Sequence, residues 1–289
     1  MSVPAAAARA LGRRLAGARR VAGGDINDAW LVELEGGTRA FVKSRAGAEP
    51  GEYATEAAGL RWLGAVVDGL PVPDVLAVDD LFLALRWVDE GRLDPRGEEE
   101  LGRGLAGVHA AGAPAFGAPP PGAPHGGLRL GAVELPAASG DDWPAFYAEH
   151  RLVPLLRAAA DRGALPSGGA AAIERAIDRL PQLAGPPEPP ARLHGDLWSG
   201  NVLAGRDGRP RLIDPAAHGG HREVDLAMLR LFGAPAPRTL AAYAEAHPLA
   251  PGHEARVPLW QLLPLLVHAV LFGGGYGASA VAAARSAAP

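Results

Sequence analysis

The chain has 289 residues, enough for a substantial core and for two lobes. Apolar residues make up 48% and charged residues 21%, as in soluble globular proteins, and the net charge of −4 argues against nucleic-acid binding as the main role. Without cysteine there is no disulfide and no thiolate metal site. The most apolar stretch, 257–272, is too short to span a bilayer and is interrupted by polar residues and prolines, so we expect a core helix of a cytoplasmic protein with no membrane partner.

The amino-terminal segment predicts a helix and then a small antiparallel sheet. Residues 1–20 are rich in Ala and Arg and lack the apolar core of a secretory signal, so we expect a first amphipathic helix there. Residues 21–34 predict a strand, a Gly-containing turn and a second strand. Residues 37–43 alternate into a third strand that ends near Lys43.

Three rare residues fall in the segments that look functional. Lys43 is the only lysine, and Asn27 and Asn201 are the only asparagines. A lysine is a compact point charge that fits between phosphate oxygens, whereas an arginine is a wide fork. The turn with Gly23 and Gly24 would offer backbone N–H groups to a phosphate, although a plain hairpin turn fits the same residues.

A helix is expected over 49–66, directly after the lysine strand. In kinase-like architectures this helix carries the carboxylate that pairs with the lysine. Glu56 is the preferred candidate and Glu52, one turn earlier, is the competitor; an exposed helix charge is the alternative for both.

Two further strands lead to Trp87 and Val88, where we expect a hinge whose backbone could hydrogen-bond an adenine ring. We place the boundary between lobes here. Residues 1–88 would form the nucleotide-binding lobe, and residues 89–289 a helical lobe with the catalytic loop and the acceptor site.

Beyond the hinge the pattern is mostly helical. Helices are expected over 97–111, 141–163 and 170–183, the second of them capped by Asp and kinked or split at Pro154. The Pro/Gly-rich stretch 113–124 predicts a loop.

The most informative stretch is 192–215, which reads R-L-H-G-D-L-W-S-G-N-V-L-A-G-R-D-G-R-P-R-L-I-D-P. Asp196 and Asn201 have the spacing of the kinase catalytic loop H-x-D-L-x-x-x-N. Residues 201–204 and 211–213 predict two short strands around a Gly-containing turn at 206–208. This hairpin ends at Asp214, where that architecture places a metal-binding carboxylate. Phosphoryl transfer requires such a set, because the protein must hold Mg²⁺ and aim a hydroxyl. Asp and Asn are also common turn formers, which is the alternative for each residue alone.

The segment after this hairpin has a histidine pair that could be mistaken for a metal cluster. His218, His221 and Glu223 match no zinc spacing, so we expect no zinc site. Asp225 is expected to brace the backbone of the catalytic loop from below. Two or three helices should close the core, with a sharp Gly-rich turn before Tyr276.

Taken together, the chain resembles the fructosamine kinase (ketosamine-3-kinase) family. The resemblance rests on G-G-D-I-N-D-A, F-V-K, E-A-A-G-L, D-W-P-A-F-Y-A-E-H-R-L, L-H-G-D-L-W-S-G-N, I-D-P-A, G-H-R-E-V-D-L-A-M and L-F-G-G-G-Y, which are spread over nearly the full length. It implies an α+β, two-lobed protein-kinase-like fold of the aminoglycoside-phosphotransferase type. Residues 117–140 depart from the family pattern, which leaves the acceptor the least defined part.

The resemblance implies ATP-dependent phosphorylation of a ketosamine at the third sugar carbon, after which the adduct releases its amine. Lys43, oriented by Glu56, would hold the α- and β-phosphates. Asn201 and Asp214 would coordinate Mg²⁺, and Asp196 would orient the attacking hydroxyl.

Four nearby residues have supporting or open roles. Trp198 is a candidate platform for the apolar face of a sugar, with a core tryptophan as the alternative. His194 is expected to brace the loop by hydrogen bonding. Arg222 and Glu223 could contact substrate or form an internal ion pair.

Three functions remain open from the sequence. The first is a kinase for a free or protein-bound ketosamine, acting as a monomer. The second is another small-molecule kinase of this fold, for an aminoglycoside, choline or sugar; an acidic acceptor pocket around 141–149 would favour a polycation. The third is a non-catalytic nucleotide-binding protein, which the presence of Lys43, Asp196, Asn201 and Asp214 disfavours.

Overall fold

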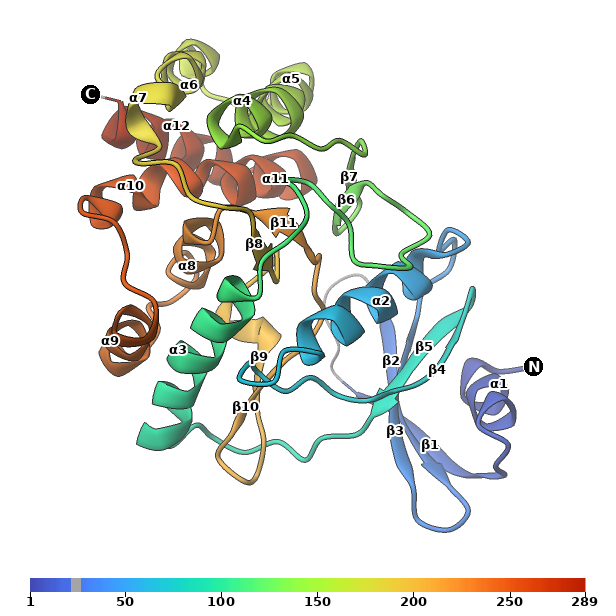
Figure 1. The fold of residues 1–289 in the computed structure, drawn as a ribbon. Coiled ribbons are helices and arrows are strands. Elements are labelled where there is room, and N and C mark those ends of the chain that lie inside the picture. Colours follow the sequence, from blue (N-terminus) through green and yellow to red (C-terminus); the bar gives the residue numbers. More distant parts are fainter. Residues whose placement is uncertain (22–26, 289) are drawn as a thin grey trace.

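The computed structural model describes residues 1–21 and 27–288 (Figure 1). Its amino-terminal part is an antiparallel sheet with the strand order β1-β2-β3-β5-β4. Two helices accompany the sheet, so the α+β class predicted from the sequence is confirmed. The elements are α1 (Val3–Ala10), β1 (Leu15–Val21), β2 (Asp28–Leu34), β3 (Arg39–Ser44), α2 (Glu52–Gly64), β4 (Val75–Asp79) and β5 (Phe82–Arg86).

The alternation of side chains along β3 decides which helix each residue faces. Ala40 and Val42 pack in one hydrophobic cluster with Ala7 and Ala8 of α1. Phe41, between them in sequence, packs in a second cluster that contains residues of α2. The next residue of that second face is Lys43, so the strand period directs the lysine toward α2.

One expected boundary was wrong. Residues 15–21 form strand β1 rather than the end of the first helix. This strand lies at the edge of the sheet and is paired only with β2 within the described strands, so most of its side chains are exposed. Its arginines therefore lie on an edge strand, where charge discourages pairing with another chain, and not on an amphipathic helix.

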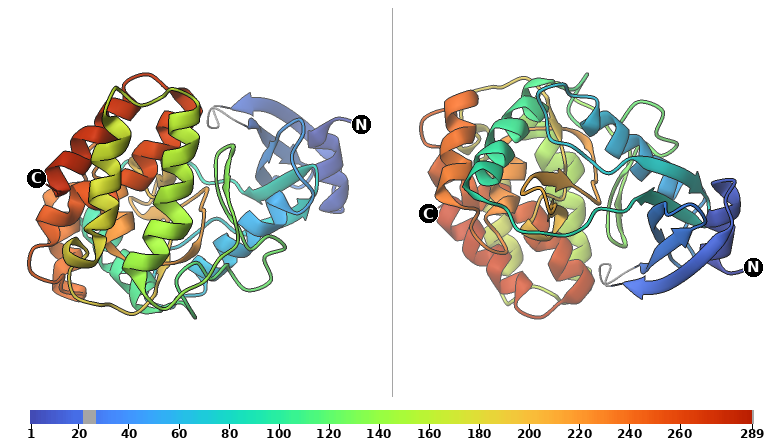
Figure 2. Two further views of the ribbon diagram at one scale, coloured as in Figure 1. Left: turned by 90° about the horizontal axis from the view of Figure 1, so that it is seen from above. Right: turned by 90° about the horizontal axis from the view of Figure 1, so that it is seen from below.

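The rest of the chain is mostly helical, and Figure 2 shows these helices gathered at the end of the molecule opposite the sheet. Within the described residues, the helices are α3 (Pro95–Ala110), α4 (Trp143–Tyr147), the π-helical turn η1 (Ala148–Leu152), α5 (Val153–Asp161), α6 (Gly169–Asp178), α7 (Leu180–Leu183), the 3₁₀ turn η2 (Ser199–Asn201), α8 (Glu223–Leu229), α9 (Pro237–Ala246), α10 (His253–Trp260), α11 (Leu262–Phe272) and α12 (Tyr276–Ala287). Their main core brings together aromatic and aliphatic side chains from α4, α5, α6, α7, α8, α10, α11 and α12.

Short strand pairs complete this part of the chain. They are β6 (Leu128–Leu130) with β7 (Val133–Leu135), β8 (Ala191–Leu193) with β11 (His218–Gly220), and β9 (Val202–Ala204) with β10 (Pro210–Leu212). The β9–β10 hairpin agrees with the sequence prediction within one residue. The β8–β11 pair and the β6–β7 hairpin were not predicted.

The expected helix over 141–163 is divided into three pieces. Asp142 caps it, with its carboxylate accepting from the N–H of Ala145 at 3.0 Å. The π-helical turn η1 directly precedes the turn that contains Pro154. A proline cannot donate to the carbonyl four residues earlier, and a π-helical turn accommodates the lost hydrogen bond.

The helical run His253–Phe272 is long and apolar enough to cross a membrane by length and composition. It begins four residues before the stretch 257–272 that the sequence analysis considered too short to span a bilayer. In the fold Leu262, Leu263 and Leu266 of this run are buried in the main core. This burial is what a core helix of a globular domain requires, as expected from the sequence.

Candidate functional site

Lys43 is a buried lysine that pairs with two carboxylates. Its Nζ is 2.6 Å from Oε2 of Glu56 on α2 and 2.7 Å from Oδ1 of Asp214, which follows β10. The lysine is only 5% exposed. Glu52, the competing carboxylate, pairs instead with Arg45. The structure thus places Glu56, one turn further along α2, against the lysine.

Burial and charge act in opposite directions within this cluster. Burial alone would lower the pKa of Lys43, but Asp214 and Glu56 outweigh it and raise that pKa. Burial raises the pKa of Glu56 to about 7 in spite of Lys43. Burial also acts to raise the pKa of Asp214, but the lysine charge prevails and lowers it. Of the two carboxylates that pair with Lys43, Asp214 is therefore charged at neutral pH, whereas Glu56 gains and loses its proton near pH 7.

Asp214 also adopts an uncommon backbone conformation. Its φ is +51°, and among the described residues it is the only one other than glycine with positive φ. Such a conformation costs of order 1–3 kcal/mol and is concentrated at functional sites, where the surrounding structure enforces it. The neighbouring Ile213 supplies two of these constraints: its N–H donates to the carbonyl of Asn201 at 3.1 Å, and its carbonyl accepts from His194 Nε2 at 2.9 Å.

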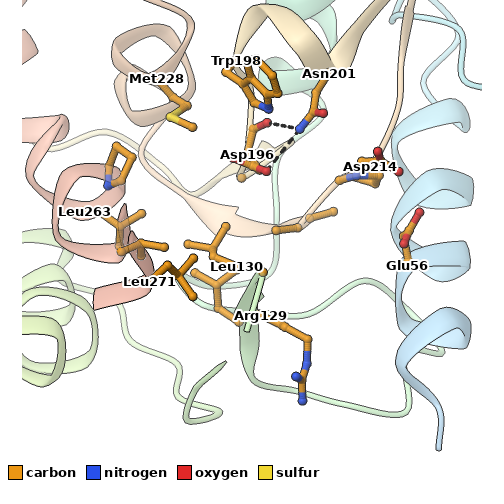
Figure 3. A pocket seen from close by; sticks show the side chains of 18 of the residues that line it. Glu56, Arg129, Leu130, Asp196, Trp198, Asn201, Asp214, Met228, Leu263 and Leu271 are labelled. Carbon is orange, nitrogen blue, oxygen red and sulfur yellow. Dashed lines mark hydrogen bonds between the residues drawn. The ribbon is translucent and has the colours of Figure 1, made fainter. Parts of the chain in front are cut away.

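The catalytic-loop residues Asp196 and Asn201 are held together by the amide of Asn201. Its Nδ2 donates to the Asp196 carbonyl at 2.7 Å and to Asp196 Oδ2 at 3.2 Å, as the dashed lines in Figure 3 show. Burial raises the pKa of Asp196, while the nearby His194 and His268 oppose that shift. The loop thus presents one carboxylate, fixed in orientation, to the same space as Asp214.

Asp225 on α8 supports this loop from below. Its Oδ2 accepts from the N–H of His194 at 2.7 Å, and its Oδ1 accepts from the N–H of Gly195 at 2.9 Å. Asp225 Oδ2 also lies 3.1 Å from His109 Nε2. At the other side of the imidazole, His109 Nδ1 lies 2.8 Å from the hydroxyl oxygen of Tyr243. His109 is therefore part of a buried chain of hydrogen bonds that ends on the loop backbone.

Gly195 is required at its place in the loop. Its φ is +83°, and a Cβ there would lie 2.1 Å from the carbonyl oxygen of Ala216. A larger residue would push the β8 strand away from the segment before β11.

Lys43, Glu56, Asp196, Asn201 and Asp214 line one cavity of about 520 Å³. In Figure 3, Asp196, Asn201, Asp214 and Glu56 border one side, and the apolar Met228, Leu263, Leu271 and Leu130 border the other. Trp198 also lines the cavity; it is 39% exposed and packs edge-on against Phe232 at 6.3 Å between ring centroids. It therefore lies at the cavity rather than in the core.

The β6–β7 hairpin forms a further wall of the cavity, which sequence reasoning missed. It joins the two parts of the chain: Arg129 donates to Glu49 at 2.9 Å and to Glu134 at 3.0 Å, and His125 Nε2 lies 2.7 Å from the carbonyl of Pro50. A signal was available in L-R-L-G-A-V-E-L, where apolar and charged residues alternate about a glycine at position 131.

The remaining residues predicted for the nucleotide site have different outcomes. Gly23 and Gly24 fall outside the described residues. Asn27 lines the cavity and accepts from the Tyr53 hydroxyl at 3.4 Å. Trp87 and Val88 do not line it, and the N–H of Trp87 already donates to the Arg39 carbonyl at 3.2 Å. Their role at an adenine ring remains a prediction.

The acidic stretch 141–149 does not line the cavity either. Asp142 is committed to capping α4. The feature that would have favoured a polycationic acceptor is therefore not present in the described cavity.

Arg222 and Glu223 form internal ion pairs. Arg222 binds Glu188 through two hydrogen bonds of 2.6 and 2.7 Å. Glu223 accepts from Arg256 at 2.6 and 2.9 Å and from Trp260 Nε1 at 2.8 Å. The sequence left open whether Arg222 and Glu223 contact substrate or form an internal ion pair. The structure shows internal ion pairs for both residues.

The same carboxylates approach His221 closely. Ligand atoms of Glu188, His221 and Glu223 all lie within 4.8 Å of one another. Since both carboxylates are already paired with arginines, a cation there would have to displace them. The absence of a zinc site expected from the sequence remains a prediction.

The donor set near Asp196 suits a hard divalent cation. Asn201 uses its amide nitrogen for Asp196, and its Oδ1 has no hydrogen-bond partner among the described residues. Oδ2 of Asp214 likewise has no such partner there, while its Oδ1 binds Lys43. An amide oxygen and a carboxylate oxygen are ligands that Mg²⁺ prefers, so these residues fit the predicted metal.

Comparisons with known proteins agree with this geometry. The sequence model of the fructosamine kinase family matches residues 3–287. A protein from Thermus thermophilus assigned as a ketoamine kinase is 37% identical over 256 residues, which cover 88% of this chain and 87% of that one. The crystal structure of a protein from Thermobifida fusca, assigned as a fructosamine-3-kinase, superposes with a TM-score of 0.90 at 46% identity and covers 99% of this chain and 98% of that one.

A more distant similarity extends to antibiotic kinases. An aminoglycoside phosphotransferase, solved with AMP-PNP and hygromycin B, superposes with a TM-score of 0.62 at 20% identity and covers 99% of each chain. At this identity the likeness concerns the fold alone. It confirms the expected fold type.

Proposed function

Because the chain belongs to the fructosamine kinase family, we propose that it transfers the γ-phosphoryl group of ATP to the carbon-3 hydroxyl of a ketosamine, in a Mg²⁺-dependent reaction. The observation that carries the proposal is the convergence of Lys43, Asp196, Asn201 and Asp214 on one cavity. Phosphorylation at carbon 3 would prepare the adduct to eliminate phosphate and release its amine, which would make the protein a deglycating enzyme. A cytoplasmic location and a monomeric state remain predictions.

Lys43 would hold the α- and β-phosphates of the nucleotide. Its ammonium is already fixed by Glu56, so it needs little reorganisation to bind an anion. Gly23 and Gly24, which precede β2 in the sequence and are predicted from it to form a turn, would offer backbone N–H groups to the phosphates. Asn201 and Asp214 would hold Mg²⁺, which neutralises charge on the transferred phosphoryl group.

Asp196 would orient the acceptor hydroxyl and take its proton as the new oxygen–phosphorus bond forms. Its carboxylate is fixed by Asn201, and the loop backbone behind it is fixed by Asp225. In a loose transition state positioning contributes more than deprotonation, so a rigidly supported carboxylate is well suited to this task. The aromatic face of Trp198 would pack against the apolar face of the sugar.

The direct test is ATP consumption by the purified protein with Mg²⁺. A ribulosamine or fructosamine adduct is compared with an aminoglycoside and with no acceptor. We expect turnover with the ketosamine, formation of a 3-phosphate, and loss of this turnover in Asp196→Ala while nucleotide affinity is retained. Turnover with the aminoglycoside alone would replace the proposed acceptor, and unchanged turnover in Asp196→Ala would contradict the role of that carboxylate.

A further inference from the structure

His268 on α11 lines the same cavity as Asp196 and Trp198, and the proposed chemistry gives it no role. Its Nδ1 lies 2.7 Å from the carbonyl oxygen of Pro264, one turn earlier in the helix. A carbonyl oxygen can only accept a hydrogen bond, so this contact assigns the proton to Nδ1. Nε2 of the neutral ring then carries a lone pair, and it has no hydrogen-bond partner among the described residues.

Three aromatic rings fix the orientation of this imidazole. The ring centroid of His268 is 4.9 Å from that of Phe232, 5.0 Å from that of Tyr276 and 5.5 Å from that of Phe272. Gly273 and Gly274, with φ of +63° and +57°, form the turn that brings Tyr276 back onto α11. The imidazole is therefore held in place by its neighbours.

Apolar side chains of α11 also border this cavity. Leu263, Val267 and Leu271, from the same helix, line the cavity with it. Asp196 lines the same cavity. A molecule whose hydroxyl reaches Asp196 would thus present its neighbouring atoms to an acceptor nitrogen bordered by aromatic rings.

We propose that His268 Nε2 accepts a hydrogen bond from the protonated amine nitrogen of the acceptor, and that the faces of Phe232 and Tyr276 stabilise its charge. This inference rests on the proposed function, because it takes the acceptor to be a ketosamine. In such a molecule the nitrogen and the carbon-3 oxygen are separated by three carbon atoms, so both can be bound in one cavity. Aromatic faces attract ammonium groups, and a hydrogen bond to a charged donor is stronger than a neutral one.

His268 is then the residue that distinguishes a glycated amine from a simple sugar. A ketose without nitrogen would still present its hydroxyl to Asp196 but would leave Nε2 without its charged donor. Selectivity of this kind comes from a polar group of the site that only the correct ligand satisfies.

The experiment measures binding by titration calorimetry in the presence of AMP-PNP and Mg²⁺. The two ligands are 1-deoxy-1-propylaminofructose and 1-deoxyfructose, which differ in the amine. The variants are His268→Phe, which keeps an aromatic ring without nitrogen, and His268→Gln, which restores an acceptor oxygen near Nε2. Affinity for AMP-PNP and thermal stability report whether each variant is folded.

The parent should bind the amine-bearing ligand about 10- to 100-fold more tightly than the deoxyketose. His268→Phe should lose most of this preference, His268→Gln should regain part of it, and affinity for 1-deoxyfructose should be the same in all three proteins. The inference is overturned if the parent shows no preference for the amine, or if His268→Phe retains that preference. Equal losses with both ligands would also overturn it, since they would indicate a structural role.

The proposed function is tested separately by turnover of the propylaminofructose. If the parent binds this ligand with the expected preference but does not phosphorylate it, the proposed reaction fails while the amine site stands. If the parent phosphorylates it without preferring the amine, the reaction stands and the amine site fails.

Discussion

Lys43 Nζ lies 2.7 Å from Asp214 Oδ1, so an ion pair joins the sheet of the amino-terminal part to the hairpin that follows the catalytic loop. The two residues are 171 positions apart in the sequence. Lys43 therefore compensates the charge of the carboxylate that is proposed to bind metal. Asp214, whose side chain is 40% exposed, keeps its other oxygen available at the cavity.

Asp214→Asn should weaken activation by Mg²⁺. The amide is neutral and binds a divalent cation less well, so the Mg²⁺ concentration for half-maximal ATP turnover should rise at least about tenfold. Asp207→Asn is the matched control, because Asp207 lies in the turn of the same hairpin and pairs with Arg211 at 2.8 Å. An unchanged Mg²⁺ titration for Asp214→Asn would exclude this carboxylate as a ligand.

Glu56 should give the acid limb of the pH profile. With a pKa of about 7, it is protonated below that pH, loses its charge and no longer orients Lys43; above that pH it is a carboxylate and the pair is formed. We expect kcat/KM for ATP to fall as the pH drops below about 7, and Glu56→Gln to be slower by about 10-fold or more and to lack this limb.

Glu52→Gln is the control for this profile, since Glu52 lies one turn earlier on α2 and pairs with Arg45. Glu52→Gln should keep the acid limb. Protonation of the nucleotide would affect the parent, Glu56→Gln and Glu52→Gln equally, so a difference between the variants comes from the protein. If Glu56→Gln shows the same limb as the parent, another group is responsible.

Asp225→Asn should reduce turnover without removing nucleotide binding. An amide cannot accept hydrogen bonds from the N–H groups of His194 and Gly195 through both of its terminal atoms, so the loop that carries Asp196 would shift. A displacement of about 1 Å at a reacting group costs up to about 10²-fold, and we expect a fall in kcat of that order.

Tyr243→Phe provides the graded comparison for this loop support. It removes the hydroxyl at the far end of the chain that runs through His109, so its effect on kcat should be smaller than that of Asp225→Asn. Steady-state kinetics together with AMP-PNP affinity separate the two effects. A loss of nucleotide affinity that matches the loss of kcat would indicate general unfolding instead.

Arg256→Met should strongly destabilise the helical part. It would leave the carboxylate of Glu223 buried without its guanidinium, and breaking a buried pair in this way costs about 3–5 kcal/mol. Arg103→Met is the control, because Arg103 forms exposed pairs with Glu99 and Glu245, which contribute at most about 1 kcal/mol. Denaturation midpoints should therefore shift for the first variant only; equal midpoints would contradict a structural role for this pair.

Local sequence determined the parts of the site whose residues are close in the chain. The spacing of Asp196 and Asn201, the β9–β10 hairpin and the alternation along β3 are properties of short segments, and the structure has each of them. Helix periodicity likewise located α2 and α3 within three residues at each end. It failed at β1, because an exposed edge strand rich in arginine has no apolar alternation to identify it.

Only the tertiary structure decided which distant residues meet. The sequence favoured Glu56 as the partner of the lysine but left Glu52 as a competitor. The packing of α2 on the sheet brings Glu56 to the lysine. Glu223 is buried because Arg256 and Trp260, more than thirty positions later, return to it. Periodicity reflects how residues close in the chain share one face of a helix or strand. Burial and ion pairing depend on contacts between distant segments, which form only when the whole core is assembled. No short stretch of sequence contains these contacts.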